Sequence, residues 1–463
     1  MCGINAVING SLEQLTNMTR ATRRRGIRTE INTIRNAHIG FAYLPITDEQ
    51  RSSAHFRYDN VCVFLNGYIS NYFELATKYQ IPVHTTSDTE VLAKFLDKFE
   101  GQRLNELNGF FSVLYYDNRK GCWVAFTDRY GIKQLYSYKD ANGTEFISSE
   151  VKGILATNPQ IEFDPFGIDD WKTTLGVMNS ETIYKGIRRV EKLHFNTNVP
   201  KIEISYDEAV FKLNDLWMKA VKRNRYNGPT GVYLSGGIDS GMISKSFQPD
   251  YCFSMDYMDE RYSEIDLIKK NSVGMHHVLI DNPQFAQMYA NKTMYALDDL
   301  KAGSCYTNFA LAELASKYVK VVYSGAGGDE FFGGYPHRKN KDPFYSIVRT
   351  DFGAYNFTDT SLIPKDWYGV SHLEYDLKFL QAVLIVEDRM SGWHTMETRY
   401  PLLDNDLVDF ALSLPDEYKE NKRILKDISG LHPDVIAGKK RGFSNPYFTN
   451  DEWVDFTLKN LKR

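Results

Sequence analysis

Apolar and polar positions along the chain follow two rhythms, and the change between them falls near residue 200. Up to about Pro200, short β-prone runs alternate with turns, as at 60–70, 109–117, 122–128, 135–140 and 145–149. Asn142-Gly143 lies between the last two runs and predicts a hairpin. One stretch, Asp88–Glu100, predicts a helix behind Thr86 or Ser87 as N-cap, because its apolar residues fall on one face: Val91, Leu92, Phe95, Leu96 and Phe99. This half predicts a layered domain of antiparallel strands with helices, of which the sequence marks one clearly.

From about Tyr206 the pattern changes. Strand-like runs at 231–234, 251–256, 276–280 and 320–325 alternate with helical patterns near 263–274 and 306–318. Such alternation is typical of a parallel sheet with crossover helices. Beyond Tyr335 the pattern is mostly helical, with helices expected over Tyr375–Asp388 and Asp404–Leu414. We therefore predict two domains, an α+β domain over 1–200 with layered antiparallel sheets, and an α/β domain over 206–463 with a parallel sheet.

Composition and charge narrow the class of protein. A chain of 463 residues is too long for a single core, and 43% hydrophobic residues with 25% charged residues are typical of soluble globular domains. The net charge of -4 comes without a basic stripe, so we predict no nucleic-acid partner. No apolar run reaches the roughly 18 residues of a membrane span, and Met-Cys-Gly-Ile-Asn at the start does not resemble a signal peptide.

The five cysteines are widely spaced, which favours neither a disulfide framework nor a zinc site. A reducing cytoplasm is the predicted location. Four of them lie in apolar runs and are expected to be buried and inert: Cys62, Cys122, Cys252 and Cys305.

The stretch 231–242 (GVYLSGGIDSGM) contains the first chemical signal. Ligands of a parallel sheet bind at the carboxyl ends of its strands, and a small polar loop follows a strand here. Its adjacent glycines let backbone N–H groups approach an anion, while Ser235 and Ser240 add hydroxyl donors. Asp239 would repel a phosphate alone and therefore suggests a bridging Mg²⁺. A plain tight turn with Asp239 as N-cap is the structural alternative.

The pattern S-G-G-x-D-S resembles the pyrophosphate-binding loop of the N-type ATP pyrophosphatases, which cleave ATP to AMP and pyrophosphate. The segment 324–335 (SGAGGDEFFGGY) resembles the S-G-x-G-x-D-E-x-F-G-G-Y segment of asparagine synthetases. Segments 396–404 (METRYPLLD) and 439–443 (KKRGF) resemble two later motifs of the same family. The resemblance covers nearly the whole chain. It implies a class II, N-terminal-nucleophile (Ntn) glutamine amidotransferase domain fused to an ATP-pyrophosphatase-type synthetase domain, with ATP and Mg²⁺ as cofactors.

The resemblance also implies roles in the synthetase half. Asp239 and Asp329 would hold Mg²⁺, and Lys440 would stabilise negative charge as pyrophosphate leaves. The implied ATP and pyrophosphate site comprises Leu234, Ser235, Gly236, Gly237, Asp239, Ser240, Met255, Ser324 and Gly325. The implied acceptor pocket comprises Ala326, Glu330 and Ser304.

The same resemblance implies that Cys2 is a catalytic nucleophile. Once Met1 is removed, Cys2 carries a thiol together with a free α-amine that can act as its base. Attack on the carboxamide of glutamine gives a thioester and releases ammonia. Asn66 and Gly67 match the family's oxyanion donors, and Asp88 matches the aspartate that holds the amino group of glutamine.

Several positions depart from the family pattern. Tyr43 stands where an arginine usually pairs with the glutamine carboxylate, and Tyr68 replaces a glutamate. Tyrosine cannot form a bidentate ion pair, so Arg28 or Arg51 is expected to compensate, or the site uses glutamine poorly or takes another amide.

In the synthetase half, Ala326 replaces a glutamate, and Ser304 lies near the place of an arginine that binds aspartate, with Lys301 as a candidate substitute. Both losses concern the acceptor pocket, while the ATP and metal residues are intact. We predict an active amide ligase with aspartate as the default carboxylate and another carboxylate as the alternative.

Three alternative hypotheses explain parts of the sequence. A β-lactam-synthetase-like ring-closing ligase would not need Cys2. A non-catalytic regulator would not need both acidic positions, Asp239 and Asp329. ATP pyrophosphatases that act on tRNA or purines share only the first loop. The resemblance further implies an ammonia tunnel and a homodimer.

Overall fold

A computed structural model describes residues 2–46, 55–174, 182–298, 305–335, 372–438, 447 and 450–461. The chain divides into two compact units. Unit 1 comprises 1–167, 180–195 and 391–397, and unit 2 comprises 168–179, 196–390 and 398–463. The chain therefore passes from one unit to the other five times. The domain boundary near 200–206 stays a prediction.

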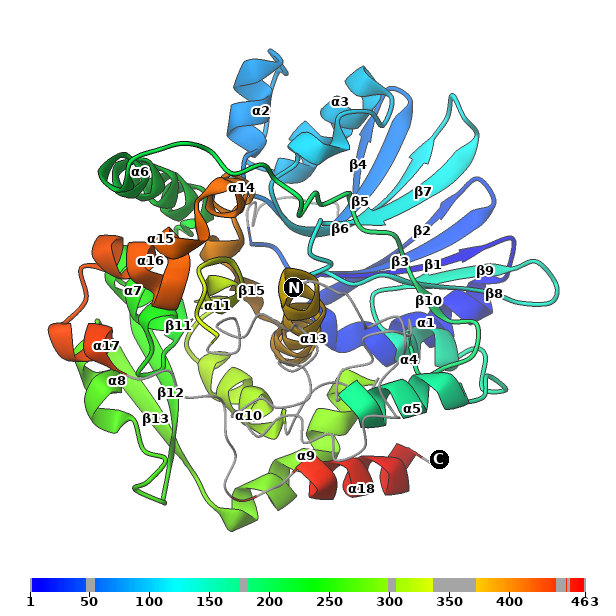
Figure 1. The fold of residues 1–463 in the computed structure, drawn as a ribbon. Helices are drawn as coiled ribbons and strands as arrows, with labels where there is room; N and C mark the ends of the chain where they lie inside the picture. Colours follow the sequence, from blue (N-terminus) through cyan, green and yellow to red (C-terminus); the bar gives the residue numbers. More distant parts are fainter. Residues whose placement is uncertain are drawn as a thin grey trace. The chain divides into compact units, whose positions relative to one another are not determined.

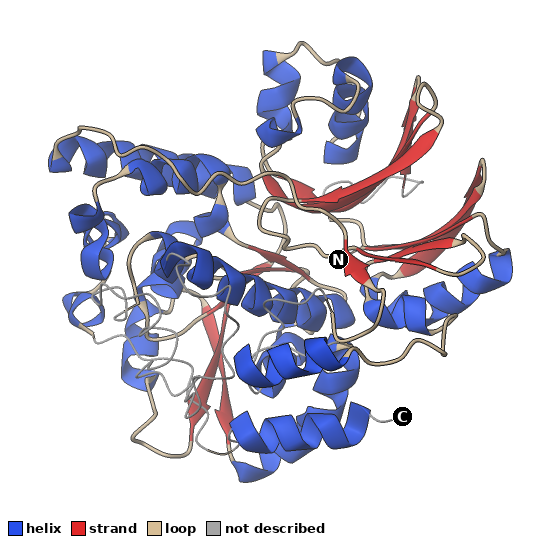
Figure 2. Ribbon diagram, turned by 45° about the vertical axis from the view of Figure 1, so that its right-hand side comes forward, coloured by secondary structure: helices blue, strands red, loops and turns tan. Residues whose placement is uncertain are grey.

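Unit 1 contains two antiparallel sheets. The six-stranded sheet has the order β10-β8-β9-β1-β3-β2, and the four-stranded sheet has the order β4-β5-β6-β7. The bounds in the first sheet are β1 Gly3–Ile8, β2 Arg28–Ile34, β3 Ala37–Tyr43, β8 Tyr136–Lys139, β9 Glu145–Ser148 and β10 Arg188–Arg189. Those in the second are β4 His55–Tyr58, β5 Val61–Ile69, β6 Gly109–Asp117 and β7 Cys122–Thr127. The two sheets lie as successive layers (Figure 2).

Helices cover the outer faces of the two sheets in unit 1. The helix α1 (Leu12–Thr22) packs on β3 and on α4 (Val151–Leu155), while α3 (Asp88–Phe99) packs on β5 and on α2 (Tyr72–Lys78), as Figure 1 shows. One core joins α1 and α4 to the six-stranded sheet, and its buried members are Val7, Leu15, Met18, Tyr136, Phe146, Val151, Ile154 and Ile187. The layered antiparallel architecture predicted for this half is confirmed.

The sequence marks only one helix of this half clearly, α3, and the structure adds α1, α2 and α4. The helix α1 begins behind a capping box in which Ser11 and Gln14 bond each other's backbone, and its buried face combines Leu15 and Met18 with Thr19 and Thr22. The two threonines interrupt the apolar stripe that would have marked a helix. The predicted helix α3 begins at Asp88 behind Ser87, as expected.

The hairpin prediction is confirmed, because Lys139 of β8 pairs with Glu145 of β9 around Asn142-Gly143. The prediction of four buried cysteines is wrong at one position. Cys122 is exposed, because it is the first residue of β7 and directly follows the turn at Gly121. Cys62, Cys252 and Cys305 are buried as predicted.

Unit 2 is built on a five-stranded sheet of order β13-β12-β11-β14-β15. The pairs β11–β12, β11–β14 and β12–β13 are parallel, which confirms the predicted parallel sheet. The strand bounds are β11 Thr230–Tyr233, β12 Tyr251–Tyr257, β13 Met275–Asp281, β14 Val321–Tyr323 and β15 Glu397–Arg399.

Helices connect these strands and continue beyond them. Around the sheet lie α6 Tyr206–Asn224, α7 Ile238–Phe247, α8 Ile265–Asn271, α9 Pro283–Leu297, α10 Tyr306–Ala315 and α11 Gly328–Phe331. The later helices are α13 His372–Trp393, α14 Asn405–Ser413, α15 Asp416–Lys419, α16 Arg423–Ser429, α17 Pro433–Ala437 and α18 Asn450–Leu461, and α5 spans Pro165–Thr174. The helices expected from 375 and from 404 are therefore present as α13 and α14. Among the described helices, none combines the length and apolar character needed to cross a bilayer.

Candidate functional sites

Cys2 lies directly before β1, the strand at the centre of the six-stranded sheet, and its side chain is buried. The backbone N–H of Leu44 donates to Cys2 Sγ at 3.4 Å. Burial raises the pKa of the Cys2 thiol, and this outweighs the hydrogen bond to Leu44 and the positive charge of Arg25, which lower it. The thiol therefore needs a nearby base to become a nucleophile at neutral pH.

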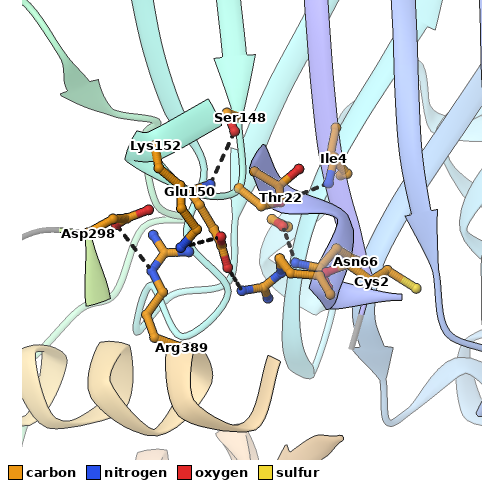
Figure 3. Close-up of polar contacts among 12 residues, drawn as sticks. Cys2, Ile4, Thr22, Asn66, Ser148, Glu150, Lys152, Asp298 and Arg389 are labelled. Atoms are coloured by element: carbon orange, nitrogen blue, oxygen red, sulfur yellow. Dashed lines mark hydrogen bonds and ion pairs between the residues drawn. The ribbon is translucent and has the colours of Figure 1, made fainter. Parts of the chain in front are cut away.

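A buried ion-pair network fixes the main chain of Cys2. Arg25, which is fully buried, donates from Nε to the Cys2 carbonyl oxygen at 2.8 Å. Its Nη1 lies 3.0 Å from Glu150 Oε1, and the second oxygen of Glu150 lies 2.7 Å from Lys152 Nζ (Figure 3). Arg25, Glu150 and Lys152 thus form consecutive ion pairs, and these pairs hold the backbone that carries the thiol in place before any ligand binds.

Asn66 and Gly67 lie near the end of β5. Asn66 is fully buried, and its Nδ2 donates to Ser112 Oγ at 3.2 Å (Figure 3). Its Oδ1 has no hydrogen-bond partner among the described residues. Gly67 has φ +118°, and a Cβ there would lie 2.1 Å from the carbonyl oxygen of Phe110, so only glycine fits. A side-chain amide and a backbone N–H are thus presented together.

Asp88 lies next to this pair. It is the first residue of α3, is buried, and accepts a hydrogen bond from the backbone N–H of Ile69 at 3.0 Å. Tyr68, also buried, lies in an aromatic group with Tyr72 and Phe110. The structure therefore brings Asn66, Tyr68 and Asp88 to one end of β5, where β5 meets α3.

Tyr43 lies at the end of β3, in the position before Leu44. Arg28 is its direct partner across the β2–β3 pair, and the Arg28 guanidinium carbon lies 4.7 Å from the centre of the Tyr43 ring. Arg28 also forms an ion pair with Glu30 at 3.2 Å. Of the two arginines expected to compensate at Tyr43, Arg28 is thus in contact with it, and Arg51 lies outside the described residues.

In unit 2, the loop at 234–237 connects β11 to α7. Ser235 Oγ accepts from the backbone N–H of Gly237 at 3.1 Å and lies 2.9 Å from Ser240 Oγ. The backbone N–H of Gly236 donates to the carboxylate of Glu264 at 3.3 Å. The loop therefore offers backbone and hydroxyl donors at the N-terminus of a ten-residue helix, and one of those donors already contacts an anionic group.

A second loop, after β14, lies against the first. A Cβ on Gly325 would lie 2.9 Å from Ser240 N, and a Cβ on Gly328 would lie 2.2 Å from Asp239 Oδ1. The glycines of this segment allow the two loops to approach at the carboxyl ends of neighbouring strands. Asp329, in the short helix α11, is thereby brought near Asp239.

Lys422, which is not among the residues predicted from the sequence, contacts both of these carboxylates. Its Nζ forms ion pairs with Asp239 Oδ2 and, at 2.6 Å, with Asp329 Oδ1. Burial lowers the pKa of the Lys422 ammonium, but the charges of Asp239 and Asp329 outweigh it and raise the pKa above its usual value. The lysine is therefore a fixed positive charge between the two loops.

The donor set fits a magnesium ion. Asp239 and Asp329 reach one cation together, and Mg²⁺ in nucleotide sites needs only one or two carboxylates beside phosphate oxygens and water. Within the described ranges, no group of three or more His, Cys, Asp or Glu residues is placed to hold a metal by itself.

Three other predicted residues, Ser324, Ala326 and Glu330, belong to the segment after β14. Ser324 is buried and donates to Glu387 Oε1 at 3.1 Å, and Ala326 N donates to Ser324 Oγ at 3.3 Å. Glu330 is buried and accepts from Tyr335 at 2.7 Å; burial, followed by the charge of Asp329, raises its pKa to about 7.

Leu234 follows β11, and its backbone N–H donates to the carbonyl oxygen of Phe253 on β12. Phe253 is also the strand partner of Tyr233, the last residue of β11. Met255, also on β12, packs against the cluster Phe285, Ala286, Tyr306 and Ala310. Lys440, Ser304 and Lys301 lie outside the described residues.

The segment 396–404 has a structural role. Arg399 donates to the carbonyl oxygens of Asn224 and Arg225, at the end of α6. Asp404 caps α14 and pairs with Arg223 at 3.0 Å. This motif thus fastens α6 to the segment before α14.

Two family models match the chain. The model of a glutamine amidotransferase domain matches residues 1–206, and the model of asparagine synthase matches 212–377 and 365–462.

Curated relatives agree with these models. Asparagine synthetase [glutamine-hydrolyzing] 1 of Bacillus subtilis is 25% identical over 90% of this chain and 82% of its own length. Putative asparagine synthetase [glutamine-hydrolyzing] 2 of Methanocaldococcus jannaschii is 27% identical over 72% of this chain and 76% of its own. Amidase chyE of Penicillium rubens is 25% identical over 66% of this chain and 52% of its own.

Proposed function

The chain belongs to the glutamine-hydrolysing asparagine synthetase family, and on this premise we propose that it releases ammonia from glutamine at Cys2 and uses it in unit 2 to convert an adenylated carboxylate into an amide. The observation that carries the proposal is the shared contact of Asp239 and Asp329, from the two glycine loops of unit 2, with Lys422.

In unit 1, removal of Met1 gives Cys2 a free α-amine, which takes the proton of the thiol. The thiolate attacks the side-chain carbonyl carbon of glutamine, the C–N bond breaks, and ammonia leaves; water then hydrolyses the thioester to glutamate. Asn66 and the N–H of Gly67 bind the oxyanion. Asn66 Nδ2 carries two N–H groups. One donates to Ser112 and fixes the plane of the amide, and the other can donate to the oxyanion.

In unit 2, the carboxylate of the acceptor attacks the α-phosphate of ATP, forming acyl-AMP and pyrophosphate. The N–H groups and hydroxyls of the 235–240 loop bind the pyrophosphate, and Lys422 adds a positive charge beside it. Asp239 and Asp329 would hold Mg²⁺, which would neutralise charge on the phosphate oxygens. Lys440 adds a second positive charge at the step in which pyrophosphate leaves.

Aspartate is the proposed carboxylate, as the names of the relatives suggest. A different carboxylate, or a ring-closing reaction like that of a β-lactam synthetase, is the second candidate. Ala326 favours it, because a methyl group replaces the carboxylate of the family pattern. The similarity to a relative named an amidase points in the same direction.

Product analysis tests the proposal. Purified chain is incubated with MgATP, glutamine and L-aspartate, and glutamate, asparagine, AMP and pyrophosphate are followed together. We expect glutamate, AMP and amide in a 1:1:1 ratio. The second candidate would be selected by two results together: glutamate is released but no AMP forms with aspartate, and AMP does form with another carboxylate. Formation of ADP in place of AMP would contradict the proposal.

A further inference from the structure

The loop after β14 lacks a carboxylate of its own at the position where the family pattern has one. Ala326 carries only a methyl group, which cannot accept a proton or bind an amine. A carboxylate reaches the same loop from elsewhere in the chain. Ser324 Oγ, which accepts from the N–H of Ala326 at 3.3 Å, donates to Glu387 Oε1 at 3.1 Å.

The surroundings of Glu387 on α13 orient it toward this loop. Residues 384–386 and 388–390 are buried, whereas Glu387 itself is partly exposed. Arg389, two residues further on, lies 3.8 Å from Asp298, and both are buried (Figure 3). Two residues on a helix point about 200° apart, so the buried pair holds the opposite side of α13 and leaves Glu387 on the side of Ser324.

The same loop lies against the phosphate loop. A Cβ on Gly325, between Ser324 and Ala326, would come within 2.9 Å of Ser240 N and 3.0 Å of Asp239 Cβ. Glu387 therefore lies next to the segment that packs on the proposed ATP site. Tyr400 lies near it as well, since burial and then the charge of Glu387 raise the pKa of the Tyr400 hydroxyl well above its usual value.

Glu330 is the rival carboxylate, and its environment argues against it. It is buried, and its Oε1 already accepts the Tyr335 hydroxyl at 2.7 Å. Its neighbour Asp329 is occupied with Lys422. Glu387, whose Oε2 atom is buried, is the carboxylate that hydrogen-bonds the loop of Ala326 directly.

We propose that Glu387 is the catalytic carboxylate of the amide-forming step, delivered from α13 in place of a side chain at position 326. The nitrogen lone pair of ammonia forms a bond to the acyl carbon of acyl-AMP. The bond from this carbon to the phosphate oxygen breaks, and AMP leaves with the electron pair. Glu387 accepts one proton from the attacking nitrogen, which leaves a neutral amide. This inference rests on the proposed function.

The test separates the two half-reactions of unit 2, with ammonium chloride as the nitrogen source so that Cys2 is not involved. Carboxylate-dependent exchange of labelled pyrophosphate into ATP measures adenylation, and amide production measures the second step. L-Aspartate is the first probe, followed by a panel of amino-acid carboxylates. For Glu387→Gln we expect exchange within about twofold of the wild type and amide formation roughly 10²-fold or more slower, the range typical of a lost general base.

Two further variants distinguish a catalytic role of Glu387 from a structural role in which it only holds Ser324 in place. Glu387→Asp, which keeps a carboxylate, should retain more amide formation than Glu387→Gln. Ala326→Glu combined with Glu387→Gln restores a carboxylate on the loop. This double variant should form amide at least about tenfold faster than Glu387→Gln alone. Glu374→Gln, an exposed position in the first turn of the same helix, is the matched control and should behave like the wild type.

Amide formation at the wild-type rate by Glu387→Gln would overturn the inference. So would an equal loss of exchange and amide formation in both Glu387→Gln and Glu387→Asp, because that result indicates a structural role. A wild-type chain that exchanges pyrophosphate with none of the carboxylates would overturn the proposed function instead, and the inference with it.

Discussion

At the scale of single residues, we propose that Tyr43 and Arg28 together provide the contact for the carboxylate of glutamine in unit 1. Tyr43 cannot form an ion pair itself, but its ring lies under the Arg28 guanidinium at 4.7 Å. Stacking on an aromatic face orients the guanidinium of Arg28, which also forms an ion pair with Glu30 at 3.2 Å. Tyr43 also precedes Leu44, whose N–H contacts the Cys2 thiol. The charge missing from position 43 is thus present one strand away.

Replacing Arg28 with alanine should raise the KM for glutamine about tenfold with little change in kcat, because a charge-assisted hydrogen bond of about 1.5 kcal/mol is lost from substrate binding. Steady-state glutamate release measures both constants. Arg35→Ala is the matched control, since Arg35 follows the same strand and bonds Asn118. An unchanged KM in Arg28→Ala would show that another group holds the carboxylate.

These residues also mark how far sequence reasoning reaches. Cys2, Asn66, Gly67 and Asp88 could be proposed because each stands in a short stretch of characteristic order. Arg28 remained one of two candidates, because contact between residues 28 and 43 depends on the register of two strands and not on spacing along the chain.

At the scale of elements, the proposed ATP site is the meeting point of three segments. The N-terminus of α7 carries Asp239, α11 carries Asp329, and the bend before α16 carries Lys422. Lys422 adopts a left-handed conformation with φ +60°, which ends one helical turn and begins the next. Its position between the two aspartates follows from that bend.

Replacing Lys422 with methionine should leave two neighbouring carboxylates without their shared cation. We expect pyrophosphate exchange to fall roughly 10²-fold or more, as for loss of a group that stabilises transition-state charge. We also expect Mg²⁺ to raise the Tm more in Lys422→Met than in the wild type, because the metal then relieves the repulsion. Lys426→Met, on α16, is the control. Exchange at the wild-type rate would refute the role.

Elements were predictable where one pattern dominated. The strands of the parallel sheet and the helices α3, α13 and α14 have strong periodicity or clear caps. The helix α1 was missed because threonines interrupt its buried stripe, and Lys422 was missed because it belongs to neither glycine motif. Ion pairs across 183 residues of chain, as between Lys422 and Asp239, arise from packing alone.

At the scale of the whole molecule, one chain carries a buried thiol in unit 1 and the proposed phosphate site with its two aspartates in unit 2. Under the proposed function, ammonia from the first site is useful only if the second site has formed an activated acyl group. We therefore expect two activities that can be separated by mutation, with Cys2 required for glutamine as the nitrogen source and dispensable for free ammonia. An ammonia tunnel and a homodimer remain predictions from the family.

The most direct measurement compares the wild type with Cys2→Ala, using glutamine in one reaction and ammonium chloride in the other. With glutamine, we expect Cys2→Ala to lose roughly 10³-fold or more of glutamate release and amide formation, as for loss of a covalent nucleophile. With ammonium chloride, we expect amide and AMP at the wild-type rate. Glutamine-dependent amide formation that survives in Cys2→Ala would contradict the account.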